Sequence, residues 1–161
     1  MANKEPTQLS PEKLVEVIKN APLVSIDLVV RNNRDEILVG MRKNEPAKGC
    51  WFVPGGRILK DERIAEAFER IGHHELGIRL SFKEAHLLGV FEHLYATNFT
   101  EKEEFGTHYV VLAYEAKIEE TALGFDLPKD QHSEYKWLSK ESLDKDQNIH
   151  PYTRVYFDCH R

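Results

Sequence analysis

Apolar and polar positions alternate in short runs over most of the chain, which is the pattern of a β-rich protein with few helices. The runs are rich in valine, isoleucine and aromatic residues, and turn-forming Gly, Pro, Asn or Asp residues separate them. The strands predicted in this way span Leu23–Val30, Glu36–Arg42, Trp51–Val53, Arg79–Phe82, Leu87–Glu92, His108–Ala116 and Tyr135–Leu138.

Fewer segments have helical features. Ser10 is a hydroxyl N-cap followed by a proline, which predicts a helix that ends near Asn20. Arg63–Leu76 predicts a longer helix because Gly77 follows it as a stop signal. Shorter helices are predicted after Ser139 and over Tyr152–Cys159. Strands in succession, interrupted by one well-marked helix, predict an α/β fold in which helices pack on the faces of a mixed sheet.

Composition narrows the class of protein. The chain has 161 residues, which predicts a single domain with a proper core. Apolar residues make up 41% and charged residues 30%, as in ordinary globular proteins. The formal net charge is −5, and no stretch is dense in Lys or Arg, so the sequence predicts neither nucleic acid nor anionic membrane as a partner. The pattern favours a small-molecule ligand.

The two cysteines and the N-terminal segment indicate the compartment. Cys50 and Cys159 form no CxxC motif, which favours free thiols in a reducing environment over a disulfide. Residues 1–10 are polar and lack the apolar run of a signal peptide, and no segment is apolar enough to span a bilayer. We therefore expect a cytoplasmic protein.

A glycine-led motif after the Trp-Phe-Val-Pro-Gly-Gly run is the most informative part of the chain. Its members are Gly56, Glu62, Arg70, Glu75, Gly77 and Ile78. Their spacing resembles the Nudix box, Gly-x5-Glu-x7-Arg-Glu-U-x-Glu-Glu-x-Gly-U, where U is a bulky apolar residue. The resemblance implies a Nudix fold, an α/β/α sandwich in which the box forms a loop–helix–loop over residues 56–78. Residues 1–161 would form one Nudix domain, with a helical segment at residues 1–22.

The helix of this motif places one carboxylate on an apolar stripe. At helical spacing Ile64, Phe68, Ile71 and Glu75 project to one side. Burial of an unpaired charge is energetically unfavourable. The Glu75 carboxylate is therefore expected either to be solvent-exposed at the last turn or to bind a partner or a metal. The spacing of the box favours the metal. Glu62 and Arg70 are expected to form a structural ion pair.

Two positions depart from the box. Ile71 and His74 stand where Nudix enzymes usually have glutamates, so one carboxylate, Glu75, remains on a helix face that usually carries three. His74 could bind metal, but a single histidine near a helix end is more often solvated, and it is not assigned to the site. The remaining ligands suit one hard cation per subunit, Mg²⁺, with Mn²⁺ as an alternative.

This depletion and the flanking sequence are similar to the GDP-mannose mannosyl hydrolase branch of the Nudix superfamily, which cleaves at the sugar carbon. The resemblance extends from Pro22 to the C-terminus. The segments that carry it are Pro22–Ser25, Pro54–Arg57, Ala67–Arg70, Thr107–Val111 and Gln131–His132. It implies a homodimer. The N-terminal segment matches poorly, so the residues that recognise the base are not assigned.

The resemblance assigns the metal ligands and the general base. Gly55, through its backbone carbonyl, Glu75 and Gln131 would hold the metal. His132 would deprotonate the attacking water, a role that suits an imidazole because its unperturbed pKa of about 6.5 lies near working pH. Without the resemblance, Gln131 reads as a surface loop residue, and any one of the 8 histidines reads as structural or solvated.

The resemblance also assigns the substrate-binding residues. Arg42, Arg57, Arg70 and Tyr109 would surround the diphosphate and stabilise the charge that develops on the leaving group. Asp27 would contact the sugar. The alternatives are that Arg70 serves only its pair with Glu62, that Tyr109 belongs to the core, and that Asp27 faces outward from its strand.

The implied reaction is Mg²⁺-dependent hydrolysis of GDP-mannose, or of GDP-glucose, to GDP and the free sugar, with inversion at the anomeric carbon. Two alternatives stay open. One is an ordinary Nudix pyrophosphatase that cleaves at phosphorus, and the other is a non-catalytic nucleotide-sugar sensor.

Overall fold

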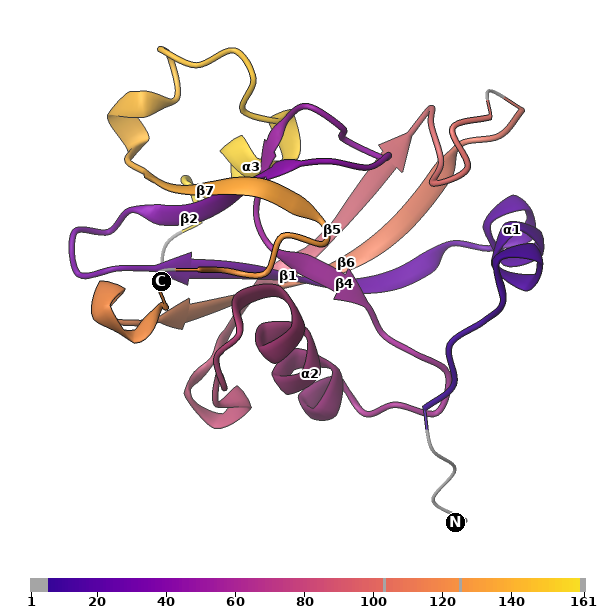
Figure 1. Ribbon diagram of the computed structural model, residues 1–161, viewed down its shortest axis with the longest axis horizontal. Coiled ribbons are helices and arrows are strands. Elements are labelled where there is room, and N and C mark those ends of the chain that lie inside the picture. The colour runs from indigo at the N-terminus through magenta and orange to yellow at the C-terminus, as the bar shows by residue number, and fades with distance from the viewer. Residues whose placement is uncertain (1–5, 103, 125, 160–161) are drawn as a thin grey trace.

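A seven-stranded mixed sheet forms the centre of the computed structural model, which describes residues 6–102, 104–124 and 126–159 (Figure 1). The main path of the sheet runs β3-β2-β1-β6-β5, while β4 pairs with β1 and β7 pairs with β2. The strands are β1 (Leu23–Arg31), β2 (Ile37–Arg42), β3 (Trp51–Phe52), β4 (Gly55–Arg57), β5 (His86–Tyr95), β6 (Thr107–Lys117) and β7 (His132–Leu138).

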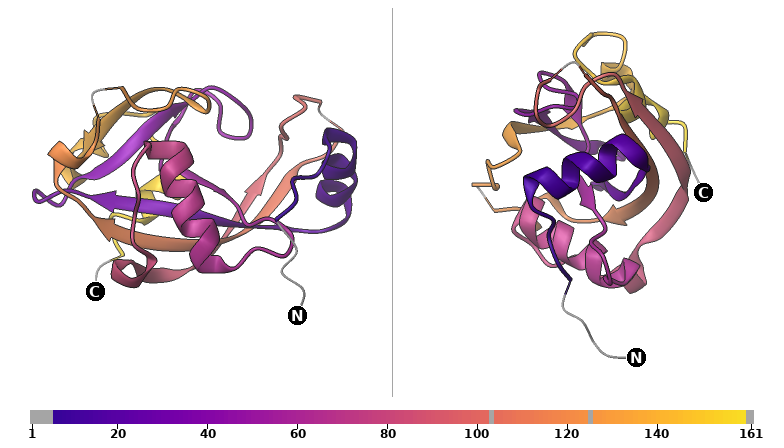
Figure 2. Two further views of the ribbon diagram at one scale, coloured as in Figure 1. Left: turned by 60° about the horizontal axis from the view of Figure 1, so that its bottom comes forward. Right: turned by 90° about the vertical axis from the view of Figure 1, so that its right-hand side faces the viewer.

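Three α-helices pack around this sheet. Helix α2 (Ile64–Leu76) covers one face, whereas α3 (Pro151–Val155) lies on the other, and α1 (Pro11–Asn20) contacts β6 near the far end of the β5–β6 hairpin (Figure 2). The predicted α/β/α arrangement is thereby confirmed. No helix in the described part of the chain is both long and apolar enough to cross a membrane.

The sheet separates two apolar cores. Ile26 and Leu28 of β1 pack against Phe68 and Ile71 of α2. The opposite core contains Val29 of β1 together with residues of β2, β3 and the C-terminal segment. A strand with apolar residues on both faces reads as a nearly continuous hydrophobic run, which is why β1 was recognisable from the sequence.

Strands β1 and β6 form the parallel pair at the centre of the sheet, in register from Leu23 opposite Tyr109 to Arg31 opposite Lys117. Arg31 is buried at the end of this pair. Its Nε donates to Oε2 of Glu115 at 2.9 Å, and its Nη2 donates to the carbonyl of Tyr156, also at 2.9 Å. These contacts attach the C-terminal segment to the sheet, which matters because Tyr156 reaches the site described below.

The structure corrects several predicted boundaries. The predicted strand Arg79–Phe82 is wrong, because the segment leads into a short 3₁₀-helix, Phe82–Glu84. The predicted strand Leu87–Glu92 extends to Tyr95, and the last strand begins at His132 rather than at Tyr135. The C-terminal helix ends at Val155, four residues before its predicted end.

Other predictions are confirmed by the structure. Helix α1 begins at Pro11 with Ser10 as its N-cap, and α2 ends at Gly77 in the left-handed conformation, with φ of 69°. Cys50 and Cys159 are free thiols. One residue of the predicted apolar stripe on α2 is an exception, because Ile64, in the first turn, is 42% exposed.

Candidate active site

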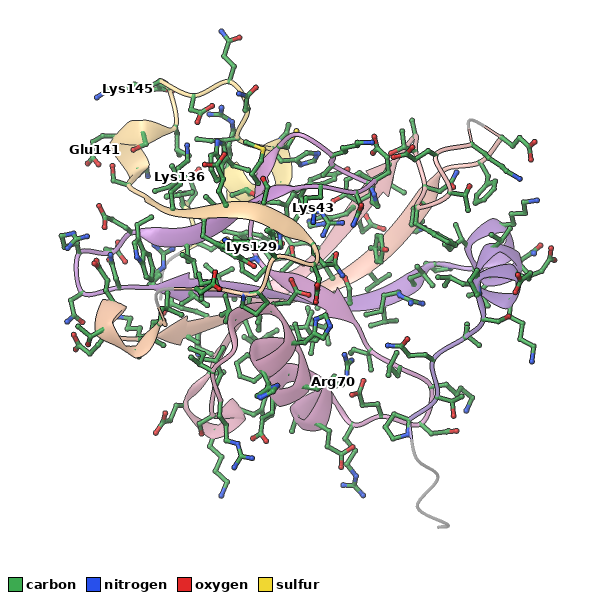
Figure 3. The ribbon with its side chains drawn as sticks, viewed as in Figure 1. Lys43, Arg70, Lys129, Lys136, Glu141 and Lys145 are labelled. Carbon is green, nitrogen blue, oxygen red and sulfur yellow. The ribbon has the colours of Figure 1, made fainter. Side chains whose placement is uncertain are left out.

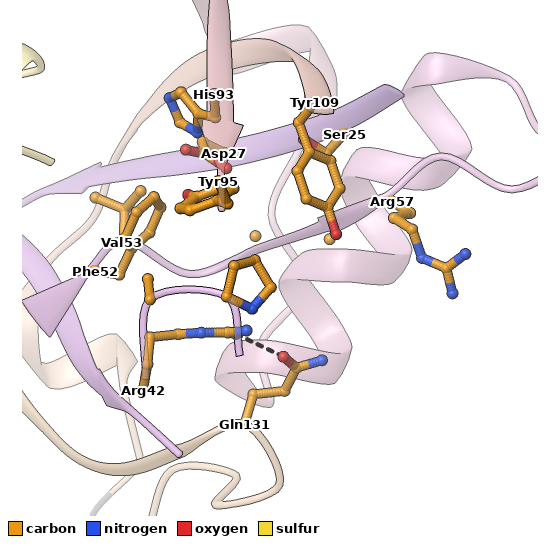
Figure 4. A pocket seen from close by; sticks show the side chains of 14 residues that line it. Ser25, Asp27, Arg42, Phe52, Val53, Arg57, His93, Tyr95, Tyr109 and Gln131 are labelled. Atoms are coloured by element: carbon orange, nitrogen blue, oxygen red, sulfur yellow. Dashed lines mark hydrogen bonds between the residues drawn. The ribbon is translucent and has the colours of Figure 1, made fainter. Parts of the chain in front are cut away.

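A cavity of about 150 Å³ lies between β1, β4 and the β5–β6 hairpin (Figure 4). It brings together residues that are distant in sequence. Its polar lining comes from β1 (Ser25, Asp27), β2 (Arg42), β4 (Arg57), β5 (His93, Tyr95), β6 (Tyr109) and the segment before β7 (Gln131). Of the predicted substrate residues, the structure therefore collects Asp27, Arg42, Arg57 and Tyr109 around one space.

A second cavity of about 490 Å³ continues from the first. Arg42, Arg57, Tyr109 and Gln131 line both, so these side chains lie at the junction. Beyond the junction the wall is partly apolar and partly acidic, with Leu14, Ile18, Leu23, Phe99, Glu45 and Glu101 among its members. The two cavities form one elongated cleft with cationic side chains in the middle.

Asp27 lies on the wall of the first cavity and is 6% exposed. Burial raises the pKa of its carboxyl group to about 7, although the hydroxyl of Tyr156 and the charge of Arg42 act in the opposite direction. Gly55 approaches this carboxyl group so closely that a Cβ at residue 55 would lie 2.8 Å from Oδ1 of Asp27. The same Cβ would lie 2.7 Å from the carbonyl oxygen of Ile26, so close approach to both the acid and the backbone of β1 requires a glycine at residue 55.

His93 and Tyr95 are site residues that the sequence analysis missed. His93 is 3% exposed and stacks on Tyr152, with ring centroids 4.0 Å apart. Burial, with a smaller contribution from His150, lowers the pKa of His93 to about 4, so its ring is neutral near pH 7. Both residues lie on the same face of β5, two positions apart, but beyond the predicted end of that strand.

Tyr109 and the two arginines at the junction form a donor-rich wall. Burial raises the pKa of the Tyr109 phenol, and the positive charges of Arg57 and Arg42 only partly offset this effect. The phenol is therefore protonated at neutral pH and available as a hydrogen-bond donor. Two guanidinium groups and a hydroxyl around one space can bind a diphosphate and stabilise negative charge on it.

Arg70 is not brought to the cleft with these residues. Its Nε and Nη2 donate to the two carboxylate oxygens of Glu62 at 2.6 and 2.9 Å, and Nη2 also donates to the carbonyl of Arg57 at 2.8 Å. The predicted structural pair with Glu62 is thereby confirmed. Arg70 does not line either cavity, and its predicted contact with the diphosphate stays a prediction.

Glu75 ends the apolar face of α2 and is 4% exposed. Two imidazole nitrogens face its carboxylate: Nδ1 of His74 lies 3.1 Å from Oε1, and Nδ1 of His132 lies 3.5 Å from Oε2. No lysine or arginine in the described part of the chain forms an ion pair with this carboxylate. A cation would supply the missing opposite charge, so the carboxylate fits a metal site.

Gln131, the predicted metal ligand outside the box, is held at the junction of the cavities. Lys43 accounts for its position, because the amide of Lys43 donates to the carbonyl of Gln131 at 3.0 Å and its Nζ donates to the carbonyl of Lys129 at 2.8 Å (Figure 3). The Gln131 Oε1 accepts from Nη1 of Arg42 at 2.6 Å (Figure 4). Arg42 therefore positions the amide oxygen of Gln131, and the role of this oxygen as a metal ligand stays a prediction.

The donor set suits one metal ion. The described residues contain no group of three or more His, Cys, Asp or Glu side chains placed to hold a metal. The carboxylate of Glu75, the amide oxygen of Gln131 and the carbonyl of Gly55 stay the predicted oxygen ligands of a hard cation. A cation held by so few protein atoms has positions left for substrate phosphates and water.

His132, the predicted general base, is 1% exposed and lines neither cavity. Its ring packs on Gly40 so tightly that a Cβ at residue 40 would lie 2.4 Å from it. Nδ1 lies 3.3 Å from the hydroxyl of Tyr135, and Nε2 has no hydrogen-bond partner among the described residues. The histidine therefore lies beside the carboxylate of Glu75 rather than on the wall of the cleft, and its role as the general base stays a prediction.

The fold and the site define a Nudix-type protein. The glycines of β4 lie against α2, and this helix ends in a buried glutamate, Glu75. The family model described as "NUDIX domain" matches residues 21–158, and the chain belongs to this family.

Relatives agree with this assignment. The chain is 36% identical over 158 residues to the low-salt glycan biosynthesis protein Agl8 of Haloferax volcanii, covering 98% of this chain and 94% of that protein. The chain is also 37% identical, over a shorter stretch of 70 residues, to an ADP-ribose pyrophosphatase of Methanocaldococcus jannaschii. This match covers 44% of this chain and 40% of that protein.

Solved structures share the fold. A MutT Nudix hydrolase from Burkholderia pseudomallei superposes with a TM-score of 0.70 at 28% identity, over 88% of this chain and 100% of that one. The Nudix domain of Shewanella oneidensis NrtR, solved with ADP-ribose, superposes with a TM-score of 0.63 at 15% identity, over 93% of this chain and 96% of that one. At this low identity the similarity establishes a shared fold and nothing more.

Proposed function

We propose that this protein hydrolyses GDP-mannose, or the closely related GDP-glucose, to GDP and the free sugar, with the help of one divalent metal ion, Mg²⁺ in the first instance. The observation that supports the proposal is the order in which acidic and aromatic, cationic, and apolar side chains follow one another along the cleft. Acid and aromatic side chains line the small first cavity, Arg42 and Arg57 lie at the junction, and a larger, partly apolar cavity follows. A sugar, a diphosphate and a nucleoside have the same order.

The first cavity has the groups that a hexose needs. The Oδ2 of Asp27 accepts from Tyr156, and its Oδ1 lies beside Gly55. Asp27 can therefore accept a hydrogen bond from a sugar hydroxyl through Oδ1. Tyr95 and the neutral ring of His93 add aromatic surface and polar atoms on the same wall.

The junction supports departure of a diphosphate. When the bond between the sugar carbon and oxygen breaks, its electrons remain on GDP, and the guanidinium groups of Arg42 and Arg57 stabilise that charge. The protonated phenol of Tyr109 donates a hydrogen bond to the same group. The metal, when bound at Gly55, Glu75 and Gln131, supplies further positive charge to the diphosphate.

Attack at carbon is favoured over attack at phosphorus because the face of the box helix that would hold the metal has one carboxylate, Glu75. Ile71 replaces a second carboxylate and is 1% exposed within the apolar core, so its position cannot hold a metal. His132 then serves as the base that deprotonates water, and exposing its Nε2 to the cleft requires a shift of the segment that carries Gln131. Direct attack by this water inverts the anomeric carbon.

The test is product analysis with purified protein, Mg²⁺ and a panel of GDP-sugars and ADP-sugars. The proposal predicts GDP and free mannose or glucose. GMP together with a sugar 1-phosphate would identify a pyrophosphatase instead, and tight binding without turnover would identify a sensor. The chain would act as a homodimer in the cytoplasm if it follows the branch that it resembles, and sedimentation of the purified protein tests the dimer.

A further inference from the structure

His74 lies in the last turn of α2, at a position of the box where a glutamate is usual, and its ring meets the one carboxylate that the box retains. Its Nδ1 is 3.1 Å from Oε1 of Glu75. The two side chains differ in exposure, since the side-chain atoms of His74 are 57% exposed and those of Glu75 are 5% exposed. His74 also lines the second cavity, where Gln131, Arg42 and Arg57 are its neighbours in the lining. The imidazole is therefore placed between the buried carboxylate and the space that a ligand would occupy.

We propose that His74 is a ligand of the divalent metal, and that its nitrogen shifts the preference of this site from Mg²⁺ toward Mn²⁺ and the later first-row ions. The inference rests on the metal site of the proposed function, but not on the identity of the substrate.

The observed separation of the two atoms suits a shared ion. Two ligand atoms that each lie about 2.1 Å from an octahedral ion, at a right angle to each other, are about 3.0 Å apart. Nδ1 of His74 and Oε1 of Glu75 are 3.1 Å apart. Neighbouring residues of a helix seldom point the same way, so this convergence at the end of α2 is a specific feature of the chain.

Electrostatics favours an ion over a hydrogen bond alone. Glu75 is buried, and the only ion-pair partners of its carboxylate among the described residues are the imidazoles of His74 and His132. An imidazole balances a buried carboxylate charge only when it carries a second proton, whereas a divalent ion does so without one. A bound ion would make burial of the Glu75 carboxylate energetically favourable. The exposed ring of His74 would then cover the ion on the side of the second cavity.

The nitrogen donor predicts the metal preference. Mg²⁺ binds oxygen ligands and water almost exclusively. The first-row transition ions also accept an imidazole nitrogen, least strongly at Mn²⁺ and increasingly strongly toward Cu²⁺. Glu75, Gln131 and Gly55 offer oxygen to either kind of ion. His74 is then the residue that discriminates between them.

The experiment is Mn²⁺ binding without substrate, followed by the electron paramagnetic resonance signal of free Mn²⁺, with Mg²⁺ as the competitor. Wild type is compared with His74→Ala, with His74→Glu, which restores a carboxylate, and with His73→Ala as the matched control. His73 is the preceding residue of the same helix and is exposed. Pulsed resonance on bound Mn²⁺ then reports directly whether an imidazole nitrogen is coordinated.

The expected result is that His74→Ala weakens Mn²⁺ binding about tenfold or more, weakens Mg²⁺ binding less, and removes the nitrogen coupling. His74→Glu is expected to favour Mg²⁺, and His73→Ala to behave as wild type. Equal losses of both ions in His74→Ala would overturn the inference and leave His74 as a group that positions Glu75. Nitrogen coupling that survives in His74→Ala would assign the nitrogen to His132 and also overturn it.

These outcomes are separable from failure of the proposed function. A protein that binds Mn²⁺ through His74 and yet releases GMP would retain the inference and lose the proposed reaction. A protein that binds neither ion would refute both the metal ligand and the metal dependence.

Discussion

The hydroxyl of Tyr156 donates a hydrogen bond of 2.6 Å to Oδ2 of Asp27, joining two residues that are 129 positions apart. The same hydroxyl lies 3.4 Å from Nε2 of His93. A phenol has one proton, so when Tyr156 donates to Asp27 it can only accept from His93. His93 then carries its proton on Nε2, and Nδ1 is left as an acceptor. Tyr156 thus positions an acid and selects a tautomer at the wall of the first cavity.

The first prediction concerns this hydroxyl. Its hydrogen bond lowers the pKa of Asp27, so Tyr156→Phe is expected to raise that pKa further above about 7. If the ionised carboxylate binds substrate, the acid limb of the kcat/KM profile moves to higher pH. Tyr152→Phe is the control, because it keeps the ring stacked on His93 and loses only the two hydrogen bonds that join the hydroxyl to the backbone of Leu94. An acid limb that is the same in all three proteins would remove Asp27 from the recognition of the sugar.

The second prediction is that Asp27→Asn stabilises the metal-free protein at pH 8 while it abolishes most activity. The folded-state pKa is raised from 3.8 to about 7, so between these values the folded protein holds a proton that the unfolded chain has released. The stability of wild type therefore falls as pH rises through this window, by a few kcal/mol at most, at about 1.4 kcal/mol per unit.

Urea unfolding at pH 4 and pH 8, in the presence of EDTA, checks this expectation. The stability gained in Asp27→Asn, relative to wild type, should be larger at pH 8 than at pH 4. A gain that does not change with pH would show that the carboxyl group ionises at its ordinary pKa in the folded protein.

The third prediction concerns Glu75. Glu75→Gln removes the charge with little change in size, so the fold should persist while much more Mg²⁺ is needed for activity and the maximal rate falls. Titration of activity with Mg²⁺ measures both effects. Glu69→Gln is the matched control, since Glu69 is an exposed residue of the same helix. An unchanged requirement for Mg²⁺ with a near-normal rate would exclude Glu75 from the site.

The fourth prediction is that His132→Gln lowers kcat much more than it raises KM. A general base acts in the transition state, and a positioned base contributes about 10²- to 10⁴-fold. Because His132 is buried next to Gly40 and Glu75, thermal unfolding of the variant must be measured alongside. His86→Gln, at an exposed residue of β5, is the control. A folded variant that keeps most of its kcat would assign the base elsewhere, with Asp27 as the next candidate.

The sequence predicted those parts of the site that belong to one local motif or one strand. The helix of the box and the pair of Glu62 with Arg70 depend on short-range spacing, and both are confirmed. The glycines before the helix were predicted as a turn, but Gly55–Arg57 form strand β4, because they pair with β1. Position 27 in β1 could be identified because one acid interrupts an apolar run. The contacts of Asp27 could not be predicted, because its hydrogen-bond partner Tyr156 comes from the C-terminal segment, 129 residues away in the sequence.

The errors have physical causes. Leu80 and Phe82 look like strand residues because both are apolar, but they pack on Gly72 and Phe68 as part of a turn. His93 and Tyr95 were missed because β5 continues past the polar residue Glu92, where its pairing with β6 sustains it. His74 is exposed, as the sequence predicted, but its contact with Glu75 was not predicted, because it depends on rotamers at the helix end that no sequence pattern specifies.

The bond that breaks is the central claim of the proposed function. In the proposed mechanism, Ile71 lies in the core and one carboxylate stands at the end of α2, so Arg42 and Arg57 would support a leaving diphosphate and attack would occur at carbon. Hydrolysis of GDP-mannose in ¹⁸O-labelled water is predicted to place the label on C1 of mannose and none in GDP, with the β anomer formed first from the α-linked donor. Label in GMP or mannose 1-phosphate would contradict the account and identify a pyrophosphatase.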